Sequence, residues 1–554
     1  MPVTDYKRQS FRINFSMQET ATELQAVEVI AIQSEILNGE RTGAATNIKK
    51  EVINTLPTFS RGLNDFIRLT PQSKSSAVAS TTGGGTSFAG QDSRFNNLTI
   101  DGSIFNNSFG LASAPAGQTN STPISLDALD EIQVNVAPFD VRQGGFTGAG
   151  INAVTRSGTN QLEGSVFHNL RNQNMIGTKI EGKDVFSERI DNGSLKFNIQ
   201  QTGFRLGGPI IKNKLFFFVN AEIERRTDPA TTFVAFRDSV STPPADANVT
   251  RVRASDMDAL QQFLITNYGY DPGSYEGYDL ETSSDKALIK FDYNINNNHR
   301  VSLRYNYLRS FRDVPASNSG SFQNRSGNKF ALNFSNSNYI INNDIHSVIA
   351  ELNSIFGSKV SNSLQVGFTA NRDYRSSGGG IFPLVDILEG GRNLTTFGFE
   401  PFTPNNILNT DTWQIQDNLT FYAGAHTITA GVNLEAFKFD NTFTPTYYGQ
   451  YVFNSLEDFY KAASGDQTVQ LRRFQQTYSA LPGGALPTAT TKAYQPGVYL
   501  QDEVDLLDNR LKVTAGIRLD MPFFDQSALN NPVVDTMIFR SPTGANANYS
   551  TDQL

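Results

Sequence analysis

Alternation of apolar and polar residues with a period of two constrains the fold of this chain most. Over residues 215–226, Leu, Phe, Val, Ala and Ile occupy every second position, and Phe, Asn and Glu lie between them. Successive side chains of a β-strand point to opposite faces, so the segment predicts a strand with one apolar face. The same pattern recurs at residues 287–295, 301–307, 348–353, 364–369, 428–435 and 513–520.

The lengths of the connections indicate what these strands build. We expect short links at residues 212–214, 296–298, 342–343, 357–359, 423–425 and 507–509. We expect long links at residues 172–192, 228–283, 313–328, 375–409, 444–487 and from 525 onward. Tight periplasmic turns alternating with long external loops are typical of an outer-membrane barrel, whose apolar face contacts lipid. A soluble sandwich would instead turn that face inward.

The two faces of the strands give a residue-level expectation. Val219, Ile289 and Val432 should point to lipid. The neighbours of these three residues, Asn220, Lys290 and Asn433, should point into the lumen.

Composition agrees with such a barrel. Only 38% of the 554 residues are hydrophobic and the mean hydropathy is −0.35. The longest apolar runs, such as residues 215–219, are far shorter than the roughly 18 residues of a spanning helix, which excludes a helical membrane protein. The 41 Phe and 19 Tyr suit aromatic girdles at the membrane surface. A net charge of −8 argues against a nucleic-acid partner.

Residues 126–171 mark a boundary between two kinds of sequence. Before them the chain is rich in Gly, Ser and Asn, and after them strands and loops alternate. The stretch holds a short apolar run at residues 132–136 and five glycines between Gly144 and Gly158. Glycine permits close backbone approach, so the pattern predicts a compact insert joined to a sheet.

Two segments carry a family resemblance. DEIQVNVAPFDVRQGGFTGAGINAVTRSGTN, residues 130–160, resembles the end of the plug domain of a TonB-dependent outer-membrane receptor. NNLTIDGSIFNN, residues 96–107, resembles an earlier plug strand and turn. The chain is most similar to the Oar-like branch, whose members carry a carboxypeptidase-regulatory-like β-sandwich before the plug. The resemblance implies a mostly β fold, with an N-terminal α+β plug domain and a transmembrane antiparallel β-barrel.

The resemblance implies four parts. Residues 1–20 would be the remnant of the β-sandwich, residues 21–36 a TonB-box-like segment, residues 37–160 the plug and residues 161–554 the first part of the barrel. The box would bind a TonB-type energy-coupling protein by adding an extended strand to the sheet of that protein. The alternative is an ordinary strand of the sandwich or plug. Candidate contact residues are Glu23, Leu24, Gln25, Ala26, Val27, Glu28 and Val29.

The number of strands predicts that this chain is a fragment. It holds about 12 strands, whereas plugged outer-membrane transporters have about 22, and a barrel of about 12 is too narrow to enclose a plug. The chain also opens within what resembles the last strand of a sandwich and stops in a loop-like tail. We therefore expect an open sheet in which the strand near Leu162 does not pair with the strand near Val513.

The sequence offers few candidates for chemistry. His168, His299, His346 and His426 have no metal-ligand spacing, and there is no cysteine, so no metal site, cofactor or enzymatic activity is expected. Short helices are expected at residues 49–70 in the plug and at residues 254–267 and 456–463 in the external loops. Three plug charges, Glu131, Arg142 and Arg156, could lock onto lumen charges such as Glu222, Glu224 or Lys290; the alternative is that they are solvated.

These expectations converge on an active-transport receptor of the bacterial outer membrane, in contact with outer-membrane lipid. The coupling protein would pull on the N-terminal segment and remodel the plug, so that a solute passes. The alternative is a barrel that transports nothing, such as an adhesin or a structural or signalling protein. The sequence leaves the solute open among peptides, glycans and metal chelates.

Overall fold

The computed structural model describes the part of the chain that holds the plug, the strands and most of the loops. The described residues are 44–56, 58, 61–75, 85–184, 196–237, 248–508, 510–525, 536–537, 539–540 and 546–547. All of them belong to one compact unit, Thr42–Leu554. The expected sandwich remnant (residues 1–20) and TonB-box-like segment (residues 21–36) lie outside the described residues.

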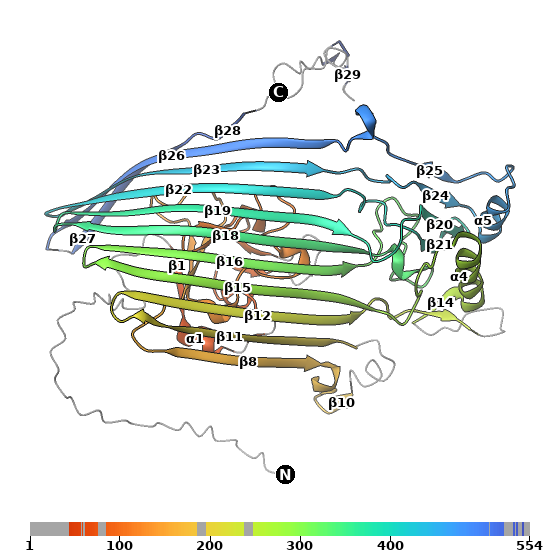
Figure 1. Cartoon of the computed structure of the whole chain (residues 1–554), viewed down its shortest axis with the longest axis horizontal. Helices are drawn as coiled ribbons and strands as arrows, with labels where there is room; N and C mark the ends of the chain where they lie inside the picture. Colours follow the sequence, from red (N-terminus) through yellow and green to blue (C-terminus); the bar gives the residue numbers. More distant parts are fainter. Residues whose placement is uncertain are drawn as a thin grey trace. The chain divides into compact units, whose positions relative to one another are not determined.

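A 12-stranded antiparallel sheet dominates the described chain, and each long strand pairs with the long strands before and after it in sequence (Figure 1). The strands are β8 (Glu163–Asn172), β11 (Asn198–Ile211), β12 (Leu215–Pro229), β15 (Asp279–Asn296), β16 (His299–Val314), β18 (Tyr339–Phe356), β19 (Val360–Ser376), β22 (Ile407–Ala423), β23 (His426–Thr442), β26 (Thr488–Leu506), β27 (Leu511–Asp520) and β28 (Phe523–Phe524). Strands β8 and β27 lie at opposite ends of this order and do not pair with each other among the described residues, as expected.

The two faces of the sheet follow the predicted alternation. Ile289 is 37% exposed and Val432 48% exposed, whereas Asn220 is 1% exposed and Lys290 8% exposed. Val219 is the register partner of Ile289 and shares its outer face. Asn433 lies on the inner face, where Arg518 donates a hydrogen bond to its side chain. The outward direction predicted for the three apolar residues and the inward direction predicted for the three polar ones are thus confirmed.

One predicted turn is wrong. Residues 342–343 lie inside β18, where Asn342 pairs with Phe311 on one side and Tyr374 on the other. An Asn-Asn pair resembles a turn sequence, but here both side chains bond across the sheet: Asn342 donates to Ser376 Oγ over 2.9 Å and Asn343 to Asn371 Oδ1 over 3.0 Å. The connection from β16 to β18 is therefore longer than predicted.

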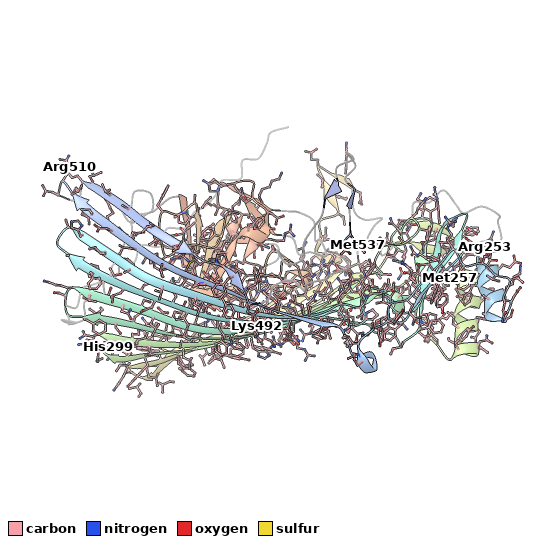
Figure 2. All side chains as sticks on the ribbon, turned by 90° about the horizontal axis from the view of Figure 1, so that it is seen from above. Arg253, Met257, His299, Lys492, Arg510 and Met537 are labelled. Carbon is pink, nitrogen blue, oxygen red and sulfur yellow. The ribbon has the colours of Figure 1, made fainter. Side chains whose placement is uncertain are left out.

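The plug lies on the concave side of the large sheet (Figure 2) and has a small sheet of its own, in the order β1-β6-β7-β4-β5. Strand β4 pairs with β7 in parallel, and the other pairs are antiparallel. These strands are β1 (Ala44–Lys49), β4 (Asn97–Ile100), β5 (Ser103–Ile104), β6 (Leu129–Val136) and β7 (Ala149–Thr155). The remaining plug elements are α1 (Lys50–Thr55), α2 (Asn64–Ile67), β2 (Ser73–Ser75), β3 (Thr86–Phe88), η1 (Ser93–Phe95), η2 (Gly117–Thr119) and η3 (Leu126–Ala128).

The plug core continues into the barrel. Phe66, Ile100 and Ile132 are fully buried, and their cluster includes apolar residues of the inner sheet face. The expected helix over residues 49–70 forms as two short helices, α1 and α2. The barrel members of the cluster are Phe218, Leu288, Leu308 and Ile345.

At the other end of the strands, four long connections fold together into one body, called here the outer cap (residues 230–237, 248–278, 315–338, 377–406 and 443–487). A five-stranded sheet, β17-β21-β20-β24-β25, joins the last three of them. The two predicted loop helices are confirmed, α5 with the predicted bounds and α4 one residue longer. The cap elements are β13 (Val234–Phe236), β14 (Val249–Arg253), α4 (Ala254–Tyr268), β17 (Leu332–Asn333), η5 (Ser335–Ser337), β20 (Leu384–Glu389), β21 (Arg392–Phe397), β24 (Gln450–Phe453), α5 (Leu456–Ala463), β25 (Arg473–Gln475) and η6 (Pro482–Gly484).

Figure 2 shows the two ends of the sheet, with His299 and Arg510 beside the short turns and Arg253 and Met257 in the outer cap. No helix in the described part of the chain is long and apolar enough to cross a membrane. The short elements not yet named are η4 (Gln173–Met175), β9 (Lys179–Ile180), β10 (Lys183–Asp184), β29 (Phe539–Arg540) and β30 (Asn546–Ala547).

Candidate functional site: the plug–barrel interface

Asp101, at the tip of the β4–β5 hairpin, forms ion pairs between the plug and the barrel. Asp101 and Gly102 have φ of 46° and 78°, and an Asp-Gly pair suits a tight hairpin turn with two positive φ angles. The Asp101 carboxylate lies 2.7 Å from Arg304 Nη1 and 3.6 Å from Lys290 Nζ, both on the inner face of the barrel. Thr155 of the plug donates its backbone N–H and its hydroxyl to the same carboxylate.

The charges around Asp101 decide its protonation. Burial alone would raise the pKa of this carboxyl group, but Arg304 and Lys290, together with the Thr155 hydrogen bonds, hold the pKa below its ordinary value. Asp101 is therefore an ionised group bound to two barrel cations. Arg304 Nη1 also donates to the Ile100 carbonyl over 2.7 Å, so this side chain bonds to both the charge and the backbone of the hairpin.

Two glutamines hold the backbone of the same turn. Gln365 on β19 donates to the Asp101 carbonyl over 2.6 Å. Gln414 on β22 accepts a hydrogen bond from the Ile104 backbone N–H over 2.8 Å. One plug hairpin is therefore bound by strands β15, β16, β19 and β22.

Further polar contacts lie around the plug. Ser125 donates to Glu222 over 2.5 Å, and Lys286 donates to the other oxygen of Glu222 over 2.9 Å. The hydroxyls of Thr119 and Ser310 are 2.7 Å apart. Remaining contacts are Asp127 with Arg205 (3.9 Å) and Ser165 (3.1 Å), Asn306 with the Pro123 carbonyl (2.9 Å) and Arg518 with the Val141 carbonyl (2.9 Å).

The structure corrects the predicted plug locks. Arg142 binds Asp140 of the plug at 2.7 Å, and Glu131 lies opposite Lys49 in the plug sheet. Arg156 Nε and Nη2 are buried without a hydrogen-bond partner, and burial lowers the pKa of this guanidinium. In the described structure none of the three forms an ion pair with a barrel strand. Of the predicted lumen partners, Glu222 and Lys290 do contact the plug, through Ser125 and Asp101.

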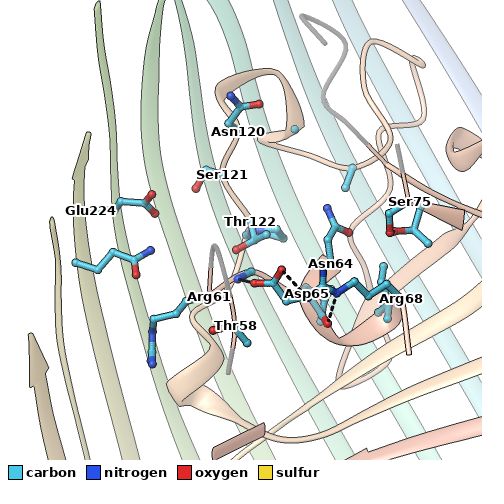
Figure 3. Close-up of a pocket in the computed structure, with 18 of the residues that line it drawn as sticks. Thr58, Arg61, Asn64, Asp65, Arg68, Ser75, Asn120, Ser121, Thr122 and Glu224 are labelled. Carbon is cyan, nitrogen blue, oxygen red and sulfur yellow. Dashed lines mark hydrogen bonds and ion pairs between the residues drawn. The ribbon is translucent and has the colours of Figure 1, made fainter. Parts of the chain in front are cut away.

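A cavity of about 860 Å³ separates the plug from strands β8, β11 and β12. Figure 3 shows Glu224 on the barrel wall, opposite Arg61 and the plug segment Asn120 to Thr122. Glu224, the third predicted lumen partner, thus lines this cavity instead of contacting the plug. The other charged residues that line it are Asp65, Arg68, Arg171, Arg226 and Lys286.

The four histidines do not cluster in the described structure. His168 bonds Thr202, His299 bonds Ser354, His346 bonds Tyr305 and His426 bonds Asp502. Among the described residues there is no group of three His, Cys, Asp or Glu side chains able to hold a metal ion.

Comparison with known proteins agrees with the fold. The model of a family described as outer membrane beta barrel domain matches residues 154–533. The TonB-dependent transporter Oar of Myxococcus xanthus is 28% identical over 222 residues, which are 40% of this chain and 19% of that protein.

Solved structures extend the likeness to the plug. The outer membrane transporter YddB of Escherichia coli aligns with a TM-score of 0.57 at 14% identity, over 86% of this chain and 56% of that one. The ferric enterobactin receptor of Pseudomonas aeruginosa aligns with a TM-score of 0.52 at 13% identity, over 87% of this chain and 57% of that one. The chain thus spans little more than half the length of these structures.

The fold, the lipid-facing apolar strands and the matched family model place this chain in the bacterial outer membrane. It belongs to the outer membrane beta barrel domain family.

Proposed function

We propose that this chain is part of a receptor that takes up a solute across the outer membrane, driven by a TonB-type energy-coupling protein of the inner membrane. The observation that carries the proposal is the attachment of the plug. One hairpin, through Asp101 and Ile104, is bound by cations and amides from four barrel strands. Such polar contacts can be exchanged for water when the plug is pulled, which suits a plug that is remodelled in each transport cycle.

The resemblance to Oar supports the coupling partner. The proposed handle is the segment of residues 23–31, which would add a strand to the coupling protein through backbone hydrogen bonds. Peptides, glycans and metal chelates all remain candidate solutes, and outer-membrane lipid surrounds the barrel. The competing function is a barrel that transports nothing, such as an adhesin or a structural or signalling barrel. An adhesin needs neither a plug nor a handle.

The test uses the full-length protein in cells, with a mixture of tryptic peptides, oligosaccharides and ferric chelates as probe. Depletion of each compound from the medium is followed by mass spectrometry, and surface binding is measured in de-energised cells. Deleting residues 23–31 should abolish depletion and leave surface binding nearly unchanged.

A matched pair of point variants separates the contribution of the segment's backbone hydrogen bonds from that of its side chains. Val27→Pro removes a backbone N–H donor and should mimic the deletion, whereas Val27→Ala keeps that donor and should transport normally. Continued depletion after the deletion would remove the handle assignment and count against energy-coupled uptake. No depletion by cells that carry the intact protein would favour the barrel that transports nothing.

A further inference from the structure

We infer that the barrel mouth holds an anion-binding site formed by Arg312 and Arg375, so that the solute of the proposed receptor carries carboxylate or phosphate groups. This inference rests on the proposed function and narrows the solute class. The two residues are called here the arginine pair.

The direction of both side chains follows from the alternation of side chains between the two faces of each strand. On β16, Arg304, Asn306 and Ser310 contact the plug and therefore face the lumen. Arg312 is two residues beyond Ser310 and shares that face. On β19, Gln365 contacts the plug, and Arg375 lies an even number of residues further along the strand. The arginine pair thus points into the lumen, just beyond the contact between Ser310 and the plug.

The register sets the pair in one lateral row of the sheet. Arg312 pairs with Ile341 on β18, and Ile341 pairs with Arg375 on β19. Neighbouring strands are about 4.8 Å apart, so the two backbones are about 10 Å apart, a span that two long side chains can close on one ligand. Continued the other way, the row runs through Thr282, Arg226, Ile199 and Arg171.

The guanidinium groups of the pair have no hydrogen-bond acceptor among the described residues. Within the described structure neither side chain forms an ion pair or donates a hydrogen bond, and Arg312 Nη1 is buried without a partner. Arg375 lies over the Tyr339 ring, with Cζ 4.8 Å from the ring centroid, which leaves its N–H groups available. A buried guanidinium donor without an acceptor is unfavourable unless a ligand supplies one.

Nearby carboxylates have partners of their own. Asp228 binds Arg226 Nε and Nη2. Asp373 accepts hydrogen bonds from Asn343 and Asn371. Glu400 accepts from the Phe402 N–H and the Thr403 hydroxyl through Oε2, whereas its Oε1 is buried without a hydrogen-bond partner. The charge of Arg375 acts on this carboxylate, but the two side chains form no ion pair in the described structure. These acids reduce the positive potential of the mouth but leave the donors of the arginine pair unoccupied.

Guanidinium groups bind carboxylate and phosphate oxygens through two parallel hydrogen bonds, and a ligand with charges at both ends can bridge the pair. The test measures binding to the purified full-length protein in detergent, with no energy source. The probe is an octapeptide of alternating Gly and Glu that carries a neutral fluorophore, and the matched probe replaces Glu by Gln. Inorganic tripolyphosphate serves as a competitor that carries phosphate instead of carboxylate.

The chain supplies a matched control on the same two strands. Arg309 and Arg372 each precede a member of the pair by three residues, lie on the outer face and bind Asp344 and Asp411. The Arg312→Gln/Arg375→Gln variant should weaken binding of the Glu peptide about tenfold or more, and Arg309→Gln/Arg372→Gln less than about twofold. The Arg312→Lys/Arg375→Lys variant keeps the charge and should retain part of the affinity, which separates loss of the site from misfolding.

Displacement of the Glu peptide by tripolyphosphate would show that the site also binds phosphate. Failure to displace the peptide would show that the site binds carboxylate only. Either result supports an anion site. Equal binding of the Glu and Gln peptides, or equal losses in the inner and outer variants, would overturn the inference. Because binding is measured without energy, a protein that binds the Glu peptide but depletes no solute would refute the proposed function and leave the anion site intact.

Discussion

The Asp101 carboxylate of the plug lies 2.7 Å from the guanidinium of Arg304 on the barrel wall. The Arg304 side chain is 1% exposed and the Asp101 side chain 14% exposed. A buried ion pair is stable only while both partners are present, because either charge left alone in the interior is strongly unfavourable. The attachment of the plug therefore depends on this pair more than on any exposed charge of the plug.

Asp101→Asn should lower the free energy of plug release by about 3–5 kcal/mol, because it leaves the buried Arg304 without its counter-charge. Urea titration of the full-length protein in detergent, followed by protease cleavage within the plug, measures this change. Asp130→Asn is the control, since the Asp130 side chain is 48% exposed and pairs with an equally open Lys50; about 0–1 kcal/mol is expected. Equal effects of the two substitutions would contradict the assignment.

The same carboxylate predicts a pH dependence. Its pKa is lowered in the folded state, so its contribution to stability is complete above the ordinary Asp value of about 4. That contribution is lost as the pH falls through the lower folded-state pKa. Protease resistance of the plug should therefore decline in acid below about pH 4 in the wild type. In Asp101→Asn this part of the decline should be absent, and an unchanged acid profile would refute the role of Asp101.

The sequence predicted well what local patterns determine. Strand faces follow from alternation, and α5 follows from Ser455, whose side chain caps the helix by accepting from Asp458 N–H, and from the Glu457–Lys461 pair. The role of Asp101 in binding the barrel was missed because an Asp-Gly pair in a sequence indicates only a tight turn. Its partner Arg304 lies 203 residues away in the sequence, and the two come together only in the folded structure. The outer cap was missed for the same reason: β20 pairs with β24, which belongs to a different loop.

An introduced charge should be tolerated less well on the lipid-facing side of a barrel strand than on its inner side. Leu303 is 46% exposed on the lipid face of β16, and Leu303→Arg should destabilise the barrel by about 2–4 kcal/mol if it lies near the membrane midplane. Ser302→Arg is the matched substitution. Its side chain would point inward between its register partners Asp292 and Glu351, and it should cost much less.

Folding in lipid vesicles at increasing urea, followed by the mobility shift of the folded barrel, compares the two variants. Asn220→Arg also places its new side chain on the inner face, but this substitution should be unfavourable. Asn220 is 1% exposed beneath the plug, so a larger side chain would collide with its surroundings. Equal costs for Leu303→Arg and Ser302→Arg would contradict the face assignment.

The outer cap should respond as one body to the loss of Asp386. This residue and Arg325 are both 0% exposed, and Asp386 also accepts hydrogen bonds from Asn393, Thr396 and Gln450. Asp386→Ala should cost about 3–5 kcal/mol of cap stability and increase proteolysis in three different loops on intact cells. Glu389→Gln, at an Arg251 pair whose Glu389 side chain is 60% exposed, should cost about 0–1 kcal/mol. Cleavage confined to one loop would show that the loops unfold separately.

A tether between plug and barrel separates transport from binding. The chain has no cysteine, so a pair introduced at Thr119 and Ser310 has no competitor. The hydroxyl oxygens of these residues are 2.7 Å apart, close enough for sulfurs at the same positions to bond. Oxidation of Thr119→Cys/Ser310→Cys should hold the plug in place and stop solute depletion, and reduction should restore it. Thr420→Cys/Thr429→Cys joins two barrel strands whose hydroxyls are 3.3 Å apart, and should bond without affecting depletion. Depletion that continues through a fully oxidised Thr119–Ser310 tether would mean that the solute passes without movement of this part of the plug.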